Sequence, residues 1–309
     1  MPASFSRLLF VAAIVPLFLA GCGTKSAKKG GMTVQQRLEK AEKEPTPEKQ
    51  AAGYLRAARF QLASGDTTGA RDSARIAFDR LKGDGDANTF APRLIDVGGF
   101  LAELGEKKPA KEAILRAAEL SAGVADAVRR TKILADAGAV AGEKGKGIGD
   151  ATLAKDLLTQ AITMADSVEE RFRSEALAAV ALGCTRAGQA ETAATLVDKL
   201  EESAKALEEP RAKAEGLAAA ASVRSETGKK DEAAALLTAA AAAAKSIDRP
   251  EGRAYALLAV ASATASCGEK KQALALLQEA DKAANKISDP AQQKTTMDKV
   301  RTAIAEIEK

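Results

Sequence analysis

The chain has 309 residues and a formal net charge of +4, and it contains no histidine and no tryptophan. A small net charge of mixed sign excludes the concentrated basic face of a nucleic-acid binder. The lack of histidine removes the usual general base, the Ser-His and Cys-His nucleophile pairs and the commonest metal ligand. Alanine, the best helix former, is abundant while aromatic residues make up 3%, which predicts an all-α protein that is not an enzyme and binds no metal, cofactor or nucleic acid.

The first 22 residues, MPASFSRLLFVAAIVPLFLAGC, have the zones of an export signal. Arg7 forms the basic zone, and the apolar run from Leu8 to Ala20 is too short to span a bilayer of about 30 Å as a helix. The run ends in Leu19-Ala20-Gly21-Cys22, which resembles the lipobox of bacterial lipoproteins. That resemblance implies cleavage between Gly21 and Cys22, removal of residues 1–21, and acylation of Cys22 by diacylglycerol and an N-acyl chain.

Two alternatives stay open at this end of the chain: an ordinary signal peptide with a chance cysteine, and an uncleaved anchor. In a lipoprotein, several acyl chains, each CH₂ group worth about 0.8 kcal/mol, would anchor Cys22 stably in a lipid bilayer. Lipoproteins kept at the inner membrane often carry Asp after the cysteine. Gly23 therefore favours the outer membrane, facing the periplasm, if the cell has one.

The segment 22–46 is predicted to hold a tether and one short helix. Residues Gly23 to Gly31 are small, polar and basic, which is typical of a flexible tether. Thr33 then offers an N-cap, with Gln36 three residues later, for a short helix up to Glu44.

From Pro47 on, one phrase recurs six times: a glycine, an alanine five residues later, and an apolar residue four further on. The glycines stand about 40 residues apart, at Gly65, Gly105, Gly149, Gly188, Gly228 and Gly268. A leucine or tyrosine eleven residues before the glycine and a small residue seven before it complete the pattern. The third copy fits when four residues are inserted just before Gly149, because Leu134 and Gly138 then take these two positions.

Each copy is predicted to be a helical hairpin. Proline, which suits the first turn of a helix, begins the first helix of several copies, at Pro47, Pro210, Pro250 and Pro290. The glycine ends that helix with a left-handed turn. The second helix has one apolar face at helical spacing, as in Ala273-Leu277-Ala280, which only a neighbouring hairpin can bury.

The phrase resembles the turn and second helix of the tetratricopeptide repeat. The resemblance implies a right-handed α-solenoid of about six helix-turn-helix repeats over 47–289, with 290–309 as a polar capping helix. The chain departs from the family in its period of about 40 residues, in having Leu and Ala where the family has large aromatics, and in placing Pro before the first helix.

The resemblance also implies a peptide-binding groove lined by the first helices. Carrying the family's groove positions onto this sequence gives a small-residue lining of mixed charge: Lys132, Ala135, Glu143, Glu175, Ala178, Arg186, Glu215, Ser222, Glu226, Tyr255, Leu258, Ser262 and Ser266. The alternative is a plain solvated face without a ligand.

Three other features have structural interpretations that we favour. Arg130, Arg173, Lys213 and Arg253 recur at one repeat position, where their stems would pack at the helix end and their charges would pair with acids of the preceding helix, such as Glu208, rather than bind an anionic polymer. The glycine-rich stretch from Gly142 to Asp156 lacks the Gly-Lys-Ser/Thr ending of a phosphate loop and is predicted to be an inter-helix insertion. Cys184 and Cys267, both placed in first helices, are predicted to be free, buried thiols.

These features predict an adaptor in the bacterial cell envelope that is anchored in the lipid bilayer and offers its surface to other, unidentified envelope proteins. Two alternatives stay open: an accessory domain of an envelope polymer-processing system, and a passive structural lipoprotein.

Overall fold

The computed structural model describes residues 32–308; the lipobox at Leu19–Cys22 and the predicted tether from Gly23 to Gly31 lie outside the described residues. Within 32–308 all regular elements are α-helices, which confirms the all-α prediction. Their bounds are α1 Val34–Glu42, α2 Pro47–Ala63, α3 Thr67–Asp79, α4 Ala87–Glu103, α5 Lys107–Ser121, α6 Ala127–Gly142, α7 Ala151–Ser167, α8 Glu170–Arg186, α9 Ala190–Ala206, α10 Pro210–Glu226, α11 Lys230–Lys245, α12 Pro250–Ser266, α13 Lys270–Ala284 and α14 Pro290–Ile307.

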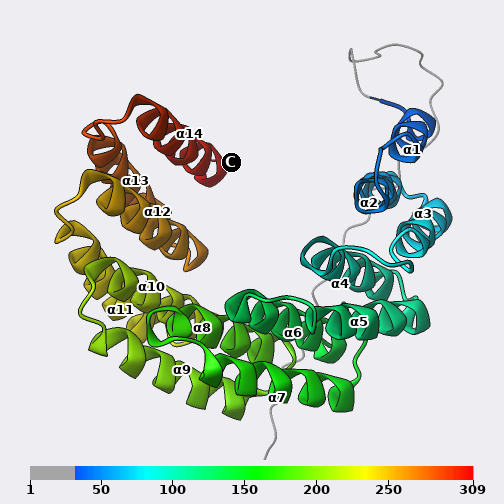
Figure 1. The fold of residues 1–309 in the computed structure, drawn as a ribbon, viewed down its shortest axis with the longest axis horizontal. Helices are drawn as coiled ribbons and strands as arrows, with labels where there is room; N and C mark the ends of the chain where they lie inside the picture. The colour runs from blue at the N-terminus through cyan, green and yellow to red at the C-terminus, as the bar shows by residue number, and fades with distance from the viewer. Residues whose placement is uncertain (1–31, 309) are drawn as a thin grey trace, which may run out of the picture. The chain divides into compact units, whose positions relative to one another are not determined.

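Helices α2 to α13 form six hairpins, which we number repeats 1 to 6, and within each hairpin we call the first helix A and the second helix B. In the unit Val34–Lys309 the hairpins follow one another in a curved row (Figure 1). Each pair packs mainly within itself and against its sequence neighbours. This succession of packed hairpins confirms the predicted solenoid arrangement.

The turn inside each hairpin depends on a glycine with left-handed backbone. All six predicted glycines have positive φ, between 76° and 91°. At Gly105 the chain closes helix A by two bonds, from Gly105 N to Ala102 O at 3.0 Å and from Glu106 N to Leu101 O at 2.8 Å. Glycine has no Cβ to clash in this conformation, so it ends helix A without strain.

Repeat 3 contains two left-handed glycines, Gly145 and Gly149. Helix A of this repeat keeps the common register when it is counted from Gly145, whereas helix B keeps it when counted from Gly149. The residues between them are an insertion fixed to the end of α6, with Ile148 N bonded to Val140 O at 2.9 Å and Asp150 N bonded to Ala141 O at 2.7 Å. The predicted four-residue insertion is confirmed.

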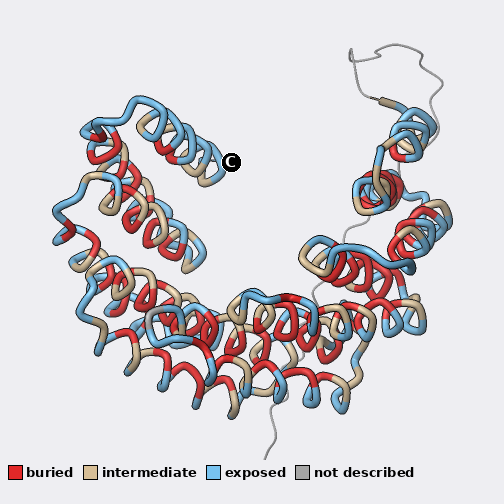
Figure 2. Tube along the Cα trace, viewed as in Figure 1, coloured by how far each residue is buried: buried red, intermediate tan, exposed pale blue. Residues whose placement is uncertain are grey.

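The core is a seam of alanine and leucine that runs between the two layers of helices (Figure 2). Seven residues before the turn glycine, a Cβ on Gly98 would lie 3.1 Å from Ile114 Cδ1, and one on Gly138 would lie 2.6 Å from Leu158 Cγ. Because helices A and B approach so closely at this register, it holds only glycine or alanine. The leucines eleven residues before the glycine, such as Leu94 and Leu257, are at most 2% exposed.

Two of the four recurring basic residues, Arg173 and Arg253, bond to main-chain carbonyls, so the predicted acidic partners were wrong for these two. Arg173 donates to Val168 O at 3.1 Å and Arg253 donates to Ile247 O at 2.7 Å. Both acceptors are main-chain carbonyls just after the preceding helix B. Carbonyls at a helix end lack intrahelical donors, so a guanidinium on the next helix satisfies them.

Helices α1 and α14 are single helices at the two ends of the row. Helix α1 is bound to repeat 1 through Glu42, which accepts from the Tyr54 hydroxyl and from Arg80 at 2.7 Å. In α14, Thr296 and Val300 are the buried residues, and most of the others face solvent. Arg301 takes the register that holds Gly or Ala in the repeats.

No helix within residues 32–308 combines the length and apolar character that crossing a bilayer requires.

The two described cysteines are free. Cys184 is buried within α8, as predicted, and burial raises the pKa of its thiol to about 11. Cys267 was predicted to be buried inside a first helix; it instead follows the last residue of α12 and is half-buried. The helix ends before Cys267 because the left-handed Gly268 follows it.

Candidate functional site: a groove on the inner face

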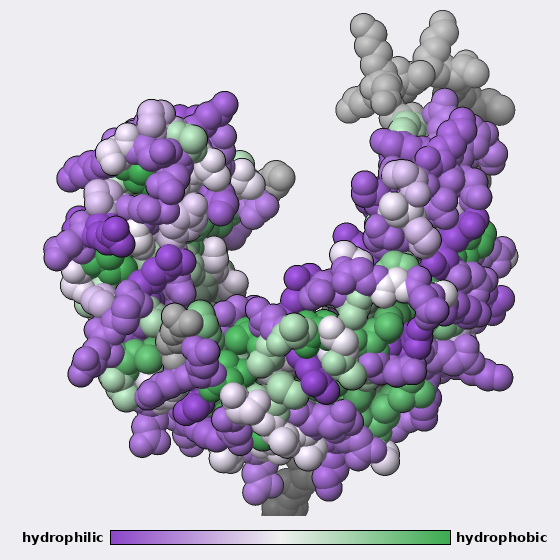
Figure 3. Space-filling model, in the orientation of Figure 1, coloured by the Kyte–Doolittle hydropathy of each residue, from purple (hydrophilic) through white to green (hydrophobic). Residues whose placement is uncertain are grey.

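The inner side of the curved row is formed by the A helices, and a large hollow on this side spans α6, α8 and α10. This inner groove has a volume of about 1100 Å³. Its lining combines apolar, small and charged side chains: Lys132, Asp136, Phe172, Ser174, Glu175, Ala178, Ala179, Leu182, Arg186, Leu207, Glu209, Arg211, Ala212, Glu215, Gly216 and Ala219. Figure 3 shows apolar residues exposed over the central helices and bordered by hydrophilic ones.

The apolar part of the inner groove consists of three large side chains with alanines between them. Phe172, in the first turn of α8, is 43% exposed, which is unusual for a phenylalanine. Leu182 lies further along α8, and Leu207 follows the end of α9. The small side chains of Ala179 and Ala219 keep the space between these residues open.

Helices α8 and α10 approach closely at the bottom of the groove. A Cβ on Gly216 would lie 3.1 Å from Ser174 Oγ and 2.9 Å from Ala204 Cβ. Ser174 is 4% exposed and its hydroxyl has no hydrogen-bond partner. The Ser174 oxygen is itself buried, so this hydroxyl belongs to the close packing of α8 on α10.

Charged residues on the rim are mostly paired with each other. Lys132 of α6 forms an ion pair with Glu175 of α8, and Arg211 pairs with Glu215 along α10 at 2.9 Å. Glu209 caps α10 by accepting from the amides of Arg211 and Ala212. The rim therefore presents little uncompensated charge, and the groove discriminates mainly by apolar contact.

Asp136 lies where the inner groove meets a second hollow of about 420 Å³ between α4 and α6. Desolvation by the surrounding residues raises the pKa of its carboxyl, while Arg186 and Lys132 act in the opposite direction and Asp96 adds to the rise. Arg186 lines both hollows as well. The two residues place one charge of each sign at the junction.

Five predicted groove residues line the inner groove: Lys132, Glu175, Ala178, Arg186 and Glu215. Glu143 lines the neighbouring hollow. Neither hollow includes Ser222, Glu226, Tyr255, Ser262 or Ser266. The three serines donate to carbonyls four residues earlier in their own helices, and Tyr255 lies beneath Lys299 of α14, with Nζ 4.9 Å from the ring centre.

Sequence reasoning missed Phe172, Leu182, Leu207, Ser174 and Asp136. Phe172 falls sixteen residues before its turn glycine, where the other repeats have Lys49, Thr89, Arg129, Ala212 and Gly252. A comparison across repeats at that position would have marked Phe172 as the single large apolar residue. Leu207 follows the end of α9, and no repeat spacing indicated its contact with the groove.

No protein-family model and no curated protein matches the chain. Several solved structures are similar to it. BtubC (BKLC) from P. vanneervenii is 12% identical, with 84% of this chain and 95% of that chain covered and a TM-score of 0.37. Ton1535 from Thermococcus onnurineus NA1 is 18% identical, with 87% of this chain and 84% of that chain covered and a TM-score of 0.32. A Rap protein crystallised with Competence and Sporulation Factor is 14% identical, with 87% of this chain and 80% of that chain covered and a TM-score of 0.34.

Proposed function

We propose that this protein is a lipid-anchored adaptor of a bacterial cell envelope that binds segments of partner proteins in the inner groove, and that it is not an enzyme. The observation that carries the proposal is the apolar lining around Phe172, Leu182 and Leu207. Hollowed apolar surfaces rimmed by polar residues are typical of protein interaction sites.

The chemistry of the inner groove suits a protein segment better than a small polar metabolite. Phe172 presents an aromatic face, and aromatic anchors in pockets dominate the binding energy of many interfaces. Rim ion pairs such as Arg211–Glu215 would restrict the orientation of the segment without adding much affinity.

The anchoring part of the proposal rests on the sequence Leu19-Ala20-Gly21-Cys22. The chain between Cys22 and Val34 reaches at most about 40 Å, so an acylated Cys22 would hold repeat 1 close to a bilayer. Gly23 favours the outer membrane, facing the periplasm, in a cell that has one.

Photo-cross-linking in cells tests both parts of the proposal. A photoreactive residue at Ala219, in the inner groove, is compared with one at Ala235, exposed on α11, and each is placed in the wild type and in Cys22→Ser. We expect a small, reproducible set of adducts from position 219 alone, reduced in Cys22→Ser. Equal adducts from both positions would contradict the groove, and an unchanged set in Cys22→Ser would contradict the anchor.

A further inference from the structure

A different hollow on the inner face lies between repeats 1 and 2. It is present because an arginine takes the place of a small or apolar residue where two helices pack. Twelve residues before the turn glycine, the A helices of the other repeats bury a small or apolar residue: Gly53, Ile133, Ala176, Gly216 and Ala256. This register packs on the preceding element, since a Cβ on Gly53 would lie 2.7 Å from Ala41 Cβ. Repeat 2 has Arg93 there, with a side chain 46% exposed. A guanidinium cannot be buried in such a seam, so a hollow of about 450 Å³ stays open between α2 and α4.

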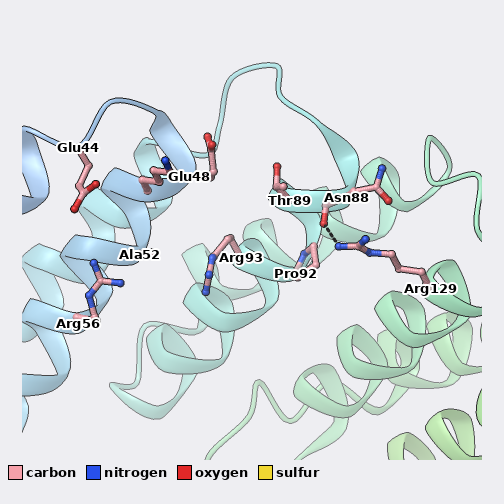
Figure 4. Close-up of a pocket in the computed structure, with 10 residues that line it drawn as sticks. Glu44, Glu48, Ala52, Arg56, Asn88, Thr89, Pro92, Arg93 and Arg129 are labelled. Carbon is pink, nitrogen blue, oxygen red and sulfur yellow. Dashed lines mark hydrogen bonds between the residues drawn. The ribbon is translucent and has the colours of Figure 1, made fainter. Parts of the chain in front are cut away.

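A proline beside Arg93 fixes a second arginine at the edge of this hollow. Pro92 lies inside α4 and has no amide hydrogen, so the carbonyl of Asn88 lacks its usual donor four residues later. Arg129 of α6 takes that place, with its guanidinium bonded to Asn88 O at 2.7 Å (Figure 4). Because the acceptor is a neutral carbonyl, Arg129 is held in position while its charge stays uncompensated.

We call this hollow the arginine hollow. The net charge of its lining residues is positive. Four cations line it, Lys49, Arg56, Arg93 and Arg129, against two carboxylates, Glu44 and Glu48. Figure 4 shows both carboxylates near the start of α2, with Arg93 between Arg56 and Arg129. Arg93 also pairs with Asp96 at 3.1 Å, an exposed pair along one helix and therefore a weak one. Within residues 32–308, Arg56 has no ion-pair or hydrogen-bond partner.

An intermediate hollow of about 690 Å³ shares lining residues with the arginine hollow and with the inner groove. Arg129 lines both the arginine hollow and the intermediate one. Lys132, Phe172 and Glu175 line both the intermediate hollow and the inner groove. A single extended segment can therefore follow the inner face from the apolar groove of repeats 3 to 5 to the arginines of repeats 1 to 3.

We propose that the arginine hollow binds carboxylates of the protein segment whose apolar side chains occupy the inner groove. The inference rests on the proposed function and deepens it, because it defines the partner segment as one with an apolar core and acidic residues to one side of it. Guanidinium groups on three successive A helices match carboxylates by charge and by their forked geometry.

The position of the hollow favours a peptide over a membrane surface as the source of these anions. Arg56, Arg93 and Arg129 come from A helices, which form the inner side of the curved row (Figure 1). A flat bilayer meets the outer and end surfaces of a curved solenoid, whereas a narrow chain enters its inner side. The polar walls formed by Asn88 and Thr89 add hydrogen-bonding groups that suit a peptide.

The test uses the detergent-solubilised full chain and three sets of matched synthetic peptides. All peptides share one leucine-rich core, and the flanking residues are four Glu, four Gln or four Lys, placed before or after the core. Binding is measured by fluorescence anisotropy at low and at 0.5 M salt. We expect the Glu peptides with one flank order to bind about tenfold more tightly than the Gln peptides at low salt, with the preference lost at high salt.

Two charge-matched triple variants isolate the arginines. Arg56→Gln/Arg93→Gln/Arg129→Gln is expected to abolish the preference for Glu while leaving the Gln peptides bound as before. Lys108→Gln/Arg249→Gln/Lys282→Gln removes the same charge from exposed positions elsewhere and is expected to keep the preference. Phe172→Ser is expected to weaken all peptides at least tenfold, which reports on the inner groove separately.

The possible results separate the two proposals. Peptide binding that is sensitive to Phe172→Ser but shows no preference for Glu, or the same preference in both triple variants, would overturn the arginine site and leave the groove standing. Binding insensitive to Phe172→Ser would overturn the groove. An arginine triple that loses binding to phosphatidylglycerol vesicles and not to Glu peptides would show that the hollow binds lipid headgroups instead.

Discussion

The inner faces of the first three and the last three repeats differ in chemistry although their helices stack in the same way. Nine residues before the turn glycine, repeats 1 to 3 have Arg56, Asp96 and Asp136, whereas repeats 4 to 6 have Ala179, Ala219 and Ala259. The registers eleven and seven residues before the glycine do not change between the halves, because leucine or tyrosine recurs at the first and a small residue at the second. Stacking and ligand chemistry are therefore encoded at separate positions and can vary independently in this solenoid.

Besides the paired charges on the rim of the inner groove, the C-terminal half contains a charged cluster between helices. Arg224 of α10 is 6% exposed and contacts Asp198 at 2.5 Å, Glu201 at 3.0 Å and Glu232 at 3.2 Å. The same register in repeat 1 holds neutral Gln61, which accepts from Ser73 Oγ at 2.7 Å. The buried guanidinium ties α9, α10 and α11 together without adding charge to the inner face.

The largest expected effect follows from removing this guanidinium. Arg224→Ala leaves three carboxylates facing a cavity, and we expect it to lower the free energy of unfolding by about 2 kcal/mol, less than for a fully buried pair because Asp198 and Glu232 are half-exposed. Arg224→Met, which fills the space, should recover part of the loss. Urea unfolding followed by circular dichroism measures both. Equal stability of the alanine variant and the wild type would show that the network is not structural.

A pair of glycine substitutions compares the seams of the two halves. A Cβ on Gly183 would lie 2.8 Å from Ala135 O, a main-chain atom of the neighbouring α6, whereas a Cβ on Gly99 would meet nothing closer than Val140 Cγ2 at 3.6 Å. Gly183→Ala should therefore destabilise the protein by about 1–2 kcal/mol through strain. Gly99→Ala should be neutral or stabilise by up to about 1 kcal/mol, because Gly is a poor residue in a helix. Thermal unfolding of both variants checks the contrast, which a stabilised Gly183→Ala would contradict.

A smaller effect is expected on the free energy of unfolding at acidic pH. Lys205 and Arg224, by hydrogen bonding, hold the pKa of the Glu201 carboxyl below its ordinary value of 4.5 although burial opposes them. The ionised form therefore stabilises the fold above pH 4.5, and this contribution is lost as the pH falls through the lowered folded pKa. Glu201→Gln should cost roughly 0.5 kcal/mol near pH 7 and nothing near pH 2. A cost independent of pH would contradict the ion-pair account.

The smallest perturbation uses the two thiols as reporters in Cys22→Ser. Cys184 is buried and its pKa is about 11, so at pH 8 it is protonated and inaccessible, whereas Cys267 is half-buried. Iodoacetamide should label Cys267 at least about a hundredfold faster, and Cys184 only on unfolding. Equal labelling rates, measured by mass spectrometry, would mean that the seam around α8 opens readily in the native state.

Local spacing was enough to predict the hairpins, because the turn glycines and the small residues seven positions earlier are fixed by contacts within one repeat. The insertion before Gly149 was predictable for the same reason. The groove was predicted only in part. Repeat positions identified Arg186 and Glu215, but Ser222 and Ser262 bond to their own helices, and Phe172 lies outside the expected register.

The arginine hollow could not have been predicted from repeat spacing. It depends on Arg93 interrupting a seam between two repeats and on Pro92 freeing a carbonyl for Arg129, which lies 41 residues from Asn88 in the chain. Contacts of this kind connect different repeats, and a pattern that is read one repeat at a time does not contain them.

The central claim is that the inner groove binds the partner, and transferring one residue between the two halves tests it most directly. Ala219→Arg places in repeat 5 the residue that repeat 1 has at the same register, Arg56, so the fold should tolerate it while the groove is filled. Ala235→Arg adds the same charge on the exposed side of α11. Partner adducts are quantified in cells with the photoreactive residue at Leu182. We expect Ala219→Arg to abolish the adducts and Ala235→Arg to leave them unchanged; undiminished adducts in Ala219→Arg would show that the partner binds elsewhere.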